Sequence, residues 1–241
     1  MRINKFLSQC GVASRRGADQ LVLDKKVSVN GKVLTGFVDI DPNTDIIKVN
    51  GKIITGTQEF VYLALHKPKG CITSVSDDKG RKTVMDFVPK NLRNLVKPVG
   101  RLDYDTEGLL ILTNDGDFAR MLTLPANQVT KVYVAKVEGE VTNDELKKLR
   151  EGVTLDDGHF AQPKSVKILS VEKNRPTASD PEFALTSIEV VLTEGKNREV
   201  RRIFDTIGKK VAFLKRTQIG KLKLGGLSRG KTKTFDPRLF R

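Results

Sequence analysis

The stretch GRLDYDTEGLLILTNDG, from Gly100 to Gly116, passes from a polar, acidic loop into an apolar run and then into an Asp-Gly turn. Apolar runs of about four to eight residues that are bounded by turn residues are typical of buried β-strands. A side chain placed directly before such a strand is held within a narrow range of positions, because the strand is rigid. The stretch therefore predicts a polar loop anchored on a buried strand.

Two carboxylates lie in this loop, Asp103 and Asp105. From the residues alone three interpretations stay open: a solvated loop, a pair of ligands for a divalent metal, and a catalytic carboxylate. The flanking Gly100 and Gly108 allow the backbone to approach a ligand closely, because glycine has no Cβ atom. The loop is therefore a candidate functional site.

Strands dominate the chain around this loop. Several segments alternate apolar and polar residues, as half-exposed antiparallel strands do. The predicted strands are 61–65, 109–113, 132–137, 165–169 and 187–193, and the predicted helices are 117–122, 142–149 and 198–207. Because strands and helices do not alternate strictly, we expect an α+β fold with a mixed, mostly antiparallel sheet. Residues 172–182 are expected to form a surface loop.

The first 57 residues predict a separate, smaller unit. Ile3, Phe6 and Leu7 recur at helical spacing before Gly11, and Ser14 is placed to cap a second helix. Short β-prone pieces follow, joined by Asn-Gly turns at positions 30–31 and 50–51. With residues 56–58 as a short linker, the predicted domains are 1–57 and 58–241.

The chain is strongly basic, with 43 lysines and arginines against 29 acidic residues, a formal net charge of +14. From Gly195 to Arg241 there are 15 basic and 3 acidic residues. Such a concentration is the expected electrostatic footprint of a polyphosphate partner, although a basic surface without a ligand stays open. Basic residues also crowd the helical end of the first unit; these are Lys5, Arg15, Arg16, Lys25 and Lys26.

Several classes of protein are excluded by the sequence. Two cysteines, Cys10 and Cys71, exclude a disulfide framework, and two histidines, His66 and His159, lie at no zinc-ligand spacing with them. No apolar run approaches the ~20 residues that span a bilayer. We expect a cytoplasmic monomer with no metal and no membrane partner, in which the two histidines and Cys71 are structural.

The first unit resembles the S4 RNA-binding domain. The resemblance lies in FLSQCGVASRR and VSVNGK, within the segment from Arg2 to Lys32. It implies that this unit grips structured RNA through phosphates and shape, and it implies no chemistry.

The rest of the chain resembles the RsuA/RluB/RluE/RluF family of ribosomal RNA pseudouridine synthases. The GRLD motif before an apolar strand carries the resemblance, and further motifs agree in the same order along the chain. They are HKPKG at His66–Gly70, KVYVAKV at Lys131–Val137, EGKNREVRRIF at Glu194–Phe204, and the closing LKR and IGKLKLGGLSRG. The resemblance implies the pseudouridine synthase fold and isomerisation of uridine in ribosomal RNA or an assembling ribosomal subunit, without a cofactor.

The resemblance also implies roles for individual residues. Asp103 matches the catalytic aspartate, and Arg101 matches the arginine that fills the gap left by the extruded uridine. Tyr133 matches the tyrosine that packs against the flipped base. Arg201, with Arg202 as the alternative, matches the basic residue that pairs with the catalytic aspartate. The implied RNA contacts of this unit are Arg101, Lys196, Arg198 and Arg202.

Three other functions stay open at this stage. A non-catalytic RNA-binding protein of ribosome assembly would need only the first unit. A metal-dependent RNA hydrolase would use Asp103 and Asp105 as ligands. The same isomerisation on small-subunit RNA is the third, although SDDKGRKTVMDFVP, from Ser76 to Pro89, is closer to the large-subunit branch.

Overall fold

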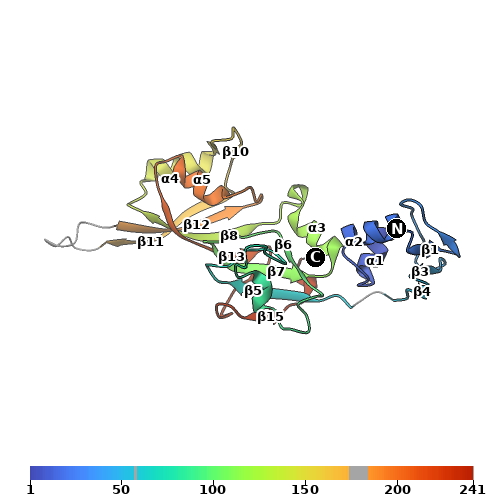
Figure 1. Ribbon diagram of the computed structural model, residues 1–241. Coiled ribbons are helices and arrows are strands. Elements are labelled where there is room, and N and C mark those ends of the chain that lie inside the picture. The colour runs from blue at the N-terminus through green and yellow to red at the C-terminus, as the bar shows by residue number, and fades with distance from the viewer. Residues whose placement is uncertain (57–58, 174–183, 241) are drawn as a thin grey trace. The chain divides into compact units, whose positions relative to one another are not determined.

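The computed structural model describes residues 1–56, 59–173 and 184–240, and the chain divides into two compact units, Met1–Phe60 and Val61–Arg241 (Figure 1). Each unit has its own hydrophobic core. The expected linker residues 57 and 58 lie outside the described residues, and so do residues 174–182 of the expected surface loop. Among the described residues, no helix has the length and apolar character needed to cross a membrane.

The first unit consists of two helices and a small antiparallel sheet with strand order β2-β1-β3-β4. Ser14 caps the second helix, since its Oγ accepts a hydrogen bond from Gly17 N at 3.0 Å. Both Asn-Gly turns have positive φ at their two central residues, as two-residue hairpin turns require. The elements are α1 (Ile3–Gln9), α2 (Arg15–Leu23), β1 (Val27–Val29), β2 (Lys32–Val33), β3 (Ile47–Val49) and β4 (Lys52–Ile53).

The second unit is built on a nine-stranded sheet whose main path runs β11-β12-β8-β13-β7-β5-β15, with β14 beside β13 and β6 beside β7. Its strands are β5 (Tyr62–Lys67), β6 (Lys97–Val99), β7 (Glu107–Thr113), β8 (Lys131–Glu138), β11 (Ser165–Lys173), β12 (Ala184–Leu192), β13 (Val211–Ile219), β14 (Leu222–Lys223) and β15 (Thr232–Thr234). A separate hairpin joins β9 (Val153–Thr154) to β10 (Phe160–Ala161). The expected mixed, mostly antiparallel α+β fold is confirmed.

Apolar side chains project from both faces of the sheet and pack against helices. On one face, α4 (Asn143–Glu151) and α5 (Glu199–Asp205) pack against β8, β11 and β12 (Figure 1). On the other, α3 (Gly116–Thr123) packs against β7 and β13 together with an aromatic cluster of Tyr62, Phe118, Phe235 and Phe240. A capping box formed by Thr142 and Glu145 starts α4. The 3₁₀ turns are η1 (Val84–Phe87), η2 (Pro125–Asn127) and η3 (Pro237–Phe240).

The centre of the sheet contains one parallel contact, between β7 and β13. It is short, pairing Lys215 with Glu107 and Arg216 with Gly108. Gly108 has φ +116°, and a Cβ atom there would overlap the carbonyl oxygen of Arg216 and lie 2.6 Å from its nitrogen. Only glycine permits both the dihedral angle and the close approach of the two backbones. Gly108 therefore determines how closely β13 packs against β7, beside the polar loop.

We predict that Gly108→Ala lowers the free energy of unfolding by at least about 2 kcal/mol, because the added methyl group forces the strands apart in an unfavourable backbone conformation. Urea denaturation of the full chain measures this change. Gly226→Ala is the matched control, since its Cβ would meet no atom within 4 Å. Equal midpoints for the two variants would contradict the prediction.

Candidate functional site

A cavity of about 550 Å³ opens between the loop before β7, the strand β8 and the segment before α5. Five of the residues expected from the sequence to be functional line it: Arg101, Asp103, Tyr133, Lys196 and Arg198. These residues come from three segments far apart in the chain. The fold thus brings most of the candidate residues of the second unit to one place.

Asp103 lies in the wall of this cavity and is partly exposed. Its backbone carbonyl accepts a hydrogen bond from Thr106 N at 3.1 Å, which closes the turn that leads into β7. Its carboxylate makes no hydrogen bond or ion pair with any residue that the structure describes. A carboxylate without a hydrogen-bond partner, held by a rigid turn, is available for a ligand.

A buried lysine holds the Asp103 turn from beneath. The Nζ of Lys67, at the end of β5, donates to the carbonyl oxygens of Asp103 at 2.9 Å, Thr106 at 2.9 Å and Pro68 at 3.2 Å. The side chain is completely buried, and burial lowers the pKa of its ammonium group from the ordinary value. Three carbonyl acceptors compensate the loss of water. Lys67 therefore fixes the loop that carries Asp103.

Tyr133 and Arg216 form the deeper part of the cavity, and both are largely buried. The Nε of Arg216 donates to Leu109 O at 2.8 Å, and its Nη1 lies 3.5 Å from Tyr133 Oη. Its Nη2 is buried and has no hydrogen-bond partner among the described residues. Because buried donors are normally satisfied, this N–H group is a candidate ligand donor.

The structure corrects one expectation about the acidic loop. Arg201 was expected to pair with Asp103, but its Nη2 lies 2.9 Å from Asp105, and its Nη1 donates to Val211 O at 2.7 Å. Arg198 also approaches Asp105, at 3.6 Å. Arg201 lies on α5 outside the cavity lining, whereas Arg198, directly before α5, is part of the lining. These pairs also weigh against a metal shared by Asp103 and Asp105, because Asp105 is already occupied by cations.

The alternative residue, Arg202, is also neutralised within the protein. Its guanidinium forms ion pairs with Asp156 and Asp157 at the tip of the β9–β10 hairpin, at 2.6 Å in the case of Asp157. Arg202 therefore links α5 to the hairpin. Because the two aspartates balance its charge, it is a poor candidate for binding a phosphate. Lys196 and Arg198 remain exposed at the cavity mouth.

The basic residues expected in the first unit lie on its two helices and the turn that follows them. Arg15, Arg16, Lys25 and Lys26 are exposed, and Lys5 is partly exposed. Lys26 lies 3.2 Å from Asp24, a solvent-exposed pair of small energetic value. The side chains are thus accessible to an anionic partner.

Three residues of the site were missed from the sequence: Lys131 and Arg216, which line the cavity, and Lys67, which holds the Asp103 turn. The sequence contained a signal for two of them. Lys67 follows Leu63 and Leu65 at the period-two spacing of one strand face. Arg216 follows Leu214 at the same spacing, and both are buried. A charged residue at an apolar-face position indicates a buried, partnered charge. Lys131 donates to the carbonyls of Val129 and Thr193, and burial lowers its pKa.

The site combines an unpaired carboxylate, a phenol and a guanidinium with an unused donor. A carboxylate can attack or stabilise an electron-poor carbon. Buried donors stabilise negative charge that develops on a leaving group. The arrangement is suited to breaking a bond between an electrophilic carbon and a group that leaves as an anion.

Known proteins share this architecture. Residues 61–206 match the family described as RNA pseudouridylate synthase, and residues 1–36 match the S4 domain. Ribosomal large subunit pseudouridine synthase B of Bacillus subtilis is 44% identical over 236 residues, covering 98% of this chain and 92% of that protein. An uncharacterised RNA pseudouridine synthase of Aquifex aeolicus is 43% identical, covering 98% and 90%.

A crystal structure of a pseudouridylate synthase superimposes with a TM-score of 0.69 at 27% identity, covering 100% of this chain and 98% of that one. The family match spans the loop of Asp103, the strand of Tyr133 and the helix of Arg201, and the relatives extend over nearly the full length. The chain belongs to the RNA pseudouridylate synthase family.

Proposed function

We propose that this enzyme converts a uridine of large-subunit ribosomal RNA into pseudouridine, with Asp103 as the catalytic carboxylate. The observation that carries the assignment of Asp103 is its unpaired carboxylate in the cavity that also contains Tyr133 and Arg216. The choice of RNA follows the name of the Bacillus subtilis relative, which is a large-subunit enzyme.

The reaction needs no further reactant. The N1–C1′ glycosidic bond of uridine breaks, the base turns, and a C5–C1′ bond forms; the C5 proton leaves and N1 gains a proton. Asp103 either attacks the nucleoside directly or promotes formation of a glycal. Both routes require the ionised carboxylate. They leave the length and mass of the RNA unchanged.

The residues around Asp103 take complementary roles in this proposal. Tyr133 packs against the extruded base, and the Nη2 of Arg216 donates to the anionic species that forms when the glycosidic bond breaks. Arg101, exposed at the cavity edge, fills the space that the base leaves in the RNA stack. Flipping the base costs a few kcal/mol, which stacking and backbone contacts offset.

We further propose that the S4 domain and the exposed Lys196 and Arg198 hold the RNA backbone. Arg201 acts through Asp105 by fixing α5 against the acidic loop, and we assign Arg202 a structural role. The proposed setting is cytoplasmic, with a single copy of the chain acting on RNA or an assembling subunit. A cofactor is not part of the proposal.

Asp103→Asn is expected to reduce isomerisation by at least about 1,000-fold, equivalent to roughly 4 kcal/mol of activation free energy. Release of tritium from RNA labelled at uridine C5 measures the reaction, because this hydrogen is lost when the C5–C1′ bond forms. RNA affinity should change less than about threefold.

Asp105→Asn is the matched comparison, since it removes a carboxylate two residues away that faces Arg201. This variant should retain substantial tritium release. Comparable activity in Asp103→Asn and the wild-type enzyme would refute the catalytic assignment and support a non-catalytic RNA-binding protein.

Arg216→Met is expected to lower the rate constant of tritium release about 100-fold, because a buried donor to the developing anion is lost. Lys215→Met, on the other side of β13, is the control, and circular dichroism checks that both variants fold. Single-turnover assays at saturating enzyme separate chemistry from binding. An unchanged rate in a folded Arg216→Met protein would exclude this role.

RNA affinity is expected to fall steeply with salt, because phosphate contacts release counterions. Replacing Lys196 with Gln should make the slope of log K against log[salt] shallower by about 0.7–0.9. Arg202→Gln should leave the slope unchanged, since Asp156 and Asp157 neutralise this arginine. Filter binding of a large-subunit RNA transcript at several salt concentrations tests both, and equal slopes for wild type and Lys196→Gln would contradict the phosphate contact.

A further inference from the structure

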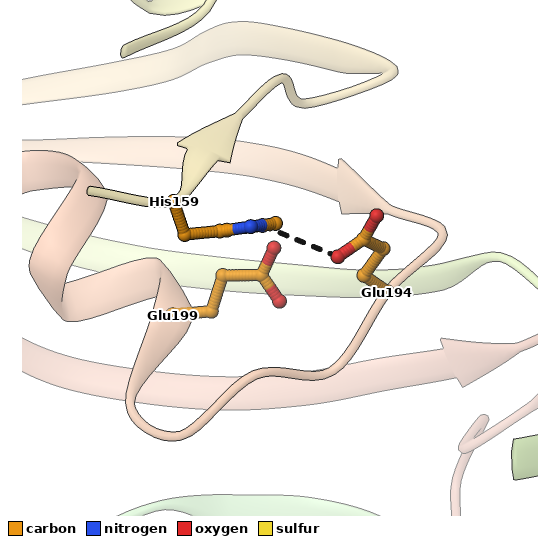
Figure 2. Close-up of side chains that lie close together, drawn as sticks. All are labelled: His159, Glu194 and Glu199. Atoms are coloured by element: carbon orange, nitrogen blue, oxygen red, sulfur yellow. Dashed lines mark ion pairs between the residues drawn. The ribbon is translucent and has the colours of Figure 1, made fainter. Parts of the chain in front are cut away.

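A cluster of one histidine and two glutamates lies at the edge of the cavity, which Glu194 and Glu199 help to line. Figure 2 shows the three side chains. His159 comes from the β9–β10 hairpin, Glu194 from the segment after β12, and Glu199 from the first turn of α5. Their side chains point toward one another, and one ligand atom of each lies within 4.8 Å of the others. None of the roles proposed above uses these three residues.

The separation of the His159 nitrogen from the Glu194 oxygen matches that of two ligand atoms bound to the same metal ion. The Nε2 of His159 lies 3.3 Å from Glu194 Oε2. This Nε2 is buried, and it makes no hydrogen bond to any described residue. In a tetrahedral site with bonds of about 2.0–2.1 Å, neighbouring ligand atoms are roughly 3.3 Å apart. The imidazole nitrogen is therefore spaced for coordination and is otherwise unsatisfied.

Glu194 and Glu199 bring two carboxylates close together. Glu199 is 6% exposed, and its Oε2 accepts one hydrogen bond from Lys196 N at 2.9 Å. A carboxylate oxygen of Glu199 lies within 4.8 Å of one of Glu194, so the two negative charges repel each other. The neighbouring ammonium of Lys131 donates to backbone carbonyls instead of to either carboxylate. A cation between the glutamates would remove this repulsion.

The backbone around the cluster is fixed by other interactions. Leu155 N donates to His159 O at 2.8 Å, and His159 N donates to Asp157 Oδ1 at 3.1 Å, so the hairpin turn is closed. The ion pairs of Arg202 with the hairpin tip hold it against α5. The three ligands are thus brought together before any ion binds, which lowers the entropic cost of binding.

We propose that His159, Glu194 and Glu199 bind one zinc ion, which cross-links the β9–β10 hairpin to the segment that carries Lys196 and Arg198. One imidazole nitrogen and two carboxylate oxygens form a ligand set that suits Zn²⁺ better than Mg²⁺ or Ca²⁺, which prefer oxygen ligands alone. Water takes the fourth position. The ion is structural and takes no part in the isomerisation.

Isothermal titration of the full-length, chelator-treated protein with ZnCl₂ at pH 7.5 tests the proposal. One site with a Kd below about 10 µM is expected. His159→Gln and Glu194→Gln should each weaken binding at least about tenfold. MgCl₂ should give no heat of binding at the same concentrations.

Glu172→Gln, a change at an exposed glutamate on β11, is the matched control and should bind zinc like the wild type. X-ray absorption of the zinc-loaded wild type supplies a second readout that does not depend on variants folding. Nitrogen and oxygen neighbours at about 2.0–2.1 Å with an imidazole signature are expected.

A sulfur shell would assign the zinc to Cys10 or Cys71 and overturn the proposal. Binding weaker than about 100 µM, or equal binding by wild type and His159→Gln, would also overturn it. None of these results tests the catalytic role proposed for Asp103, because neither the titration nor X-ray absorption measures isomerisation.

Discussion

The close approach of β7 and β13 at Gly108 and Arg216 is the constraint on which the site depends. A short parallel contact at this point places the backbone of Arg216 against a residue that has no side chain. The polar loop with Asp103 ends where β7 begins, so the same contact brings the Arg216 guanidinium to the cavity beside that loop. β8 lies on the other side of β13 and contributes Tyr133. A displacement of β13 large enough to fit a methyl group at Gly108 would separate Asp103, Tyr133 and Arg216.

Buried cations organise this region by binding backbone carbonyls. Lys67 holds the turn at Asp103 and Thr106, and Arg216 holds Leu109. Each cation has given up water, so each is stable only while these acceptors keep their positions. Lys67 also interacts electrostatically with the carboxylate of Asp103. The same residues therefore contribute to the fold and to the electrostatics of the site.

The basic residues differ in how much of their side chain is available to RNA. Arg201 and Arg202 are largely buried and are held by Asp105 and by the hairpin aspartates, whereas Lys196 and Arg198 are exposed at the cavity mouth, Arg198 with a longer contact of 3.6 Å to Asp105. The hairpin is thus attached to α5 at a position next to the proposed RNA-binding segment. A zinc ion at the neighbouring cluster would strengthen that attachment. Net charge therefore overstates the number of cations that face a ligand.

The sequence by itself determined the α+β class, the S4-like unit, the loop of Asp103, the strands β5, β7, β8, β11 and β12 and the helices α3, α4 and α5, because these depend on short-range periodicity, turn residues and contiguous motifs. The central strand β13 was not among the predicted strands. The sequence also predicted Tyr133 and Arg101 at a common site. Only the tertiary structure decided that Arg201 meets Asp105, that Lys67 holds the Asp103 turn, that Arg216 lines the cavity, and that His159 meets two glutamates. Those contacts join residues 35 to 107 positions apart in the chain, so strand order and register decide them. Spacing along the chain carries no information about which of two nearby carboxylates faces a given arginine.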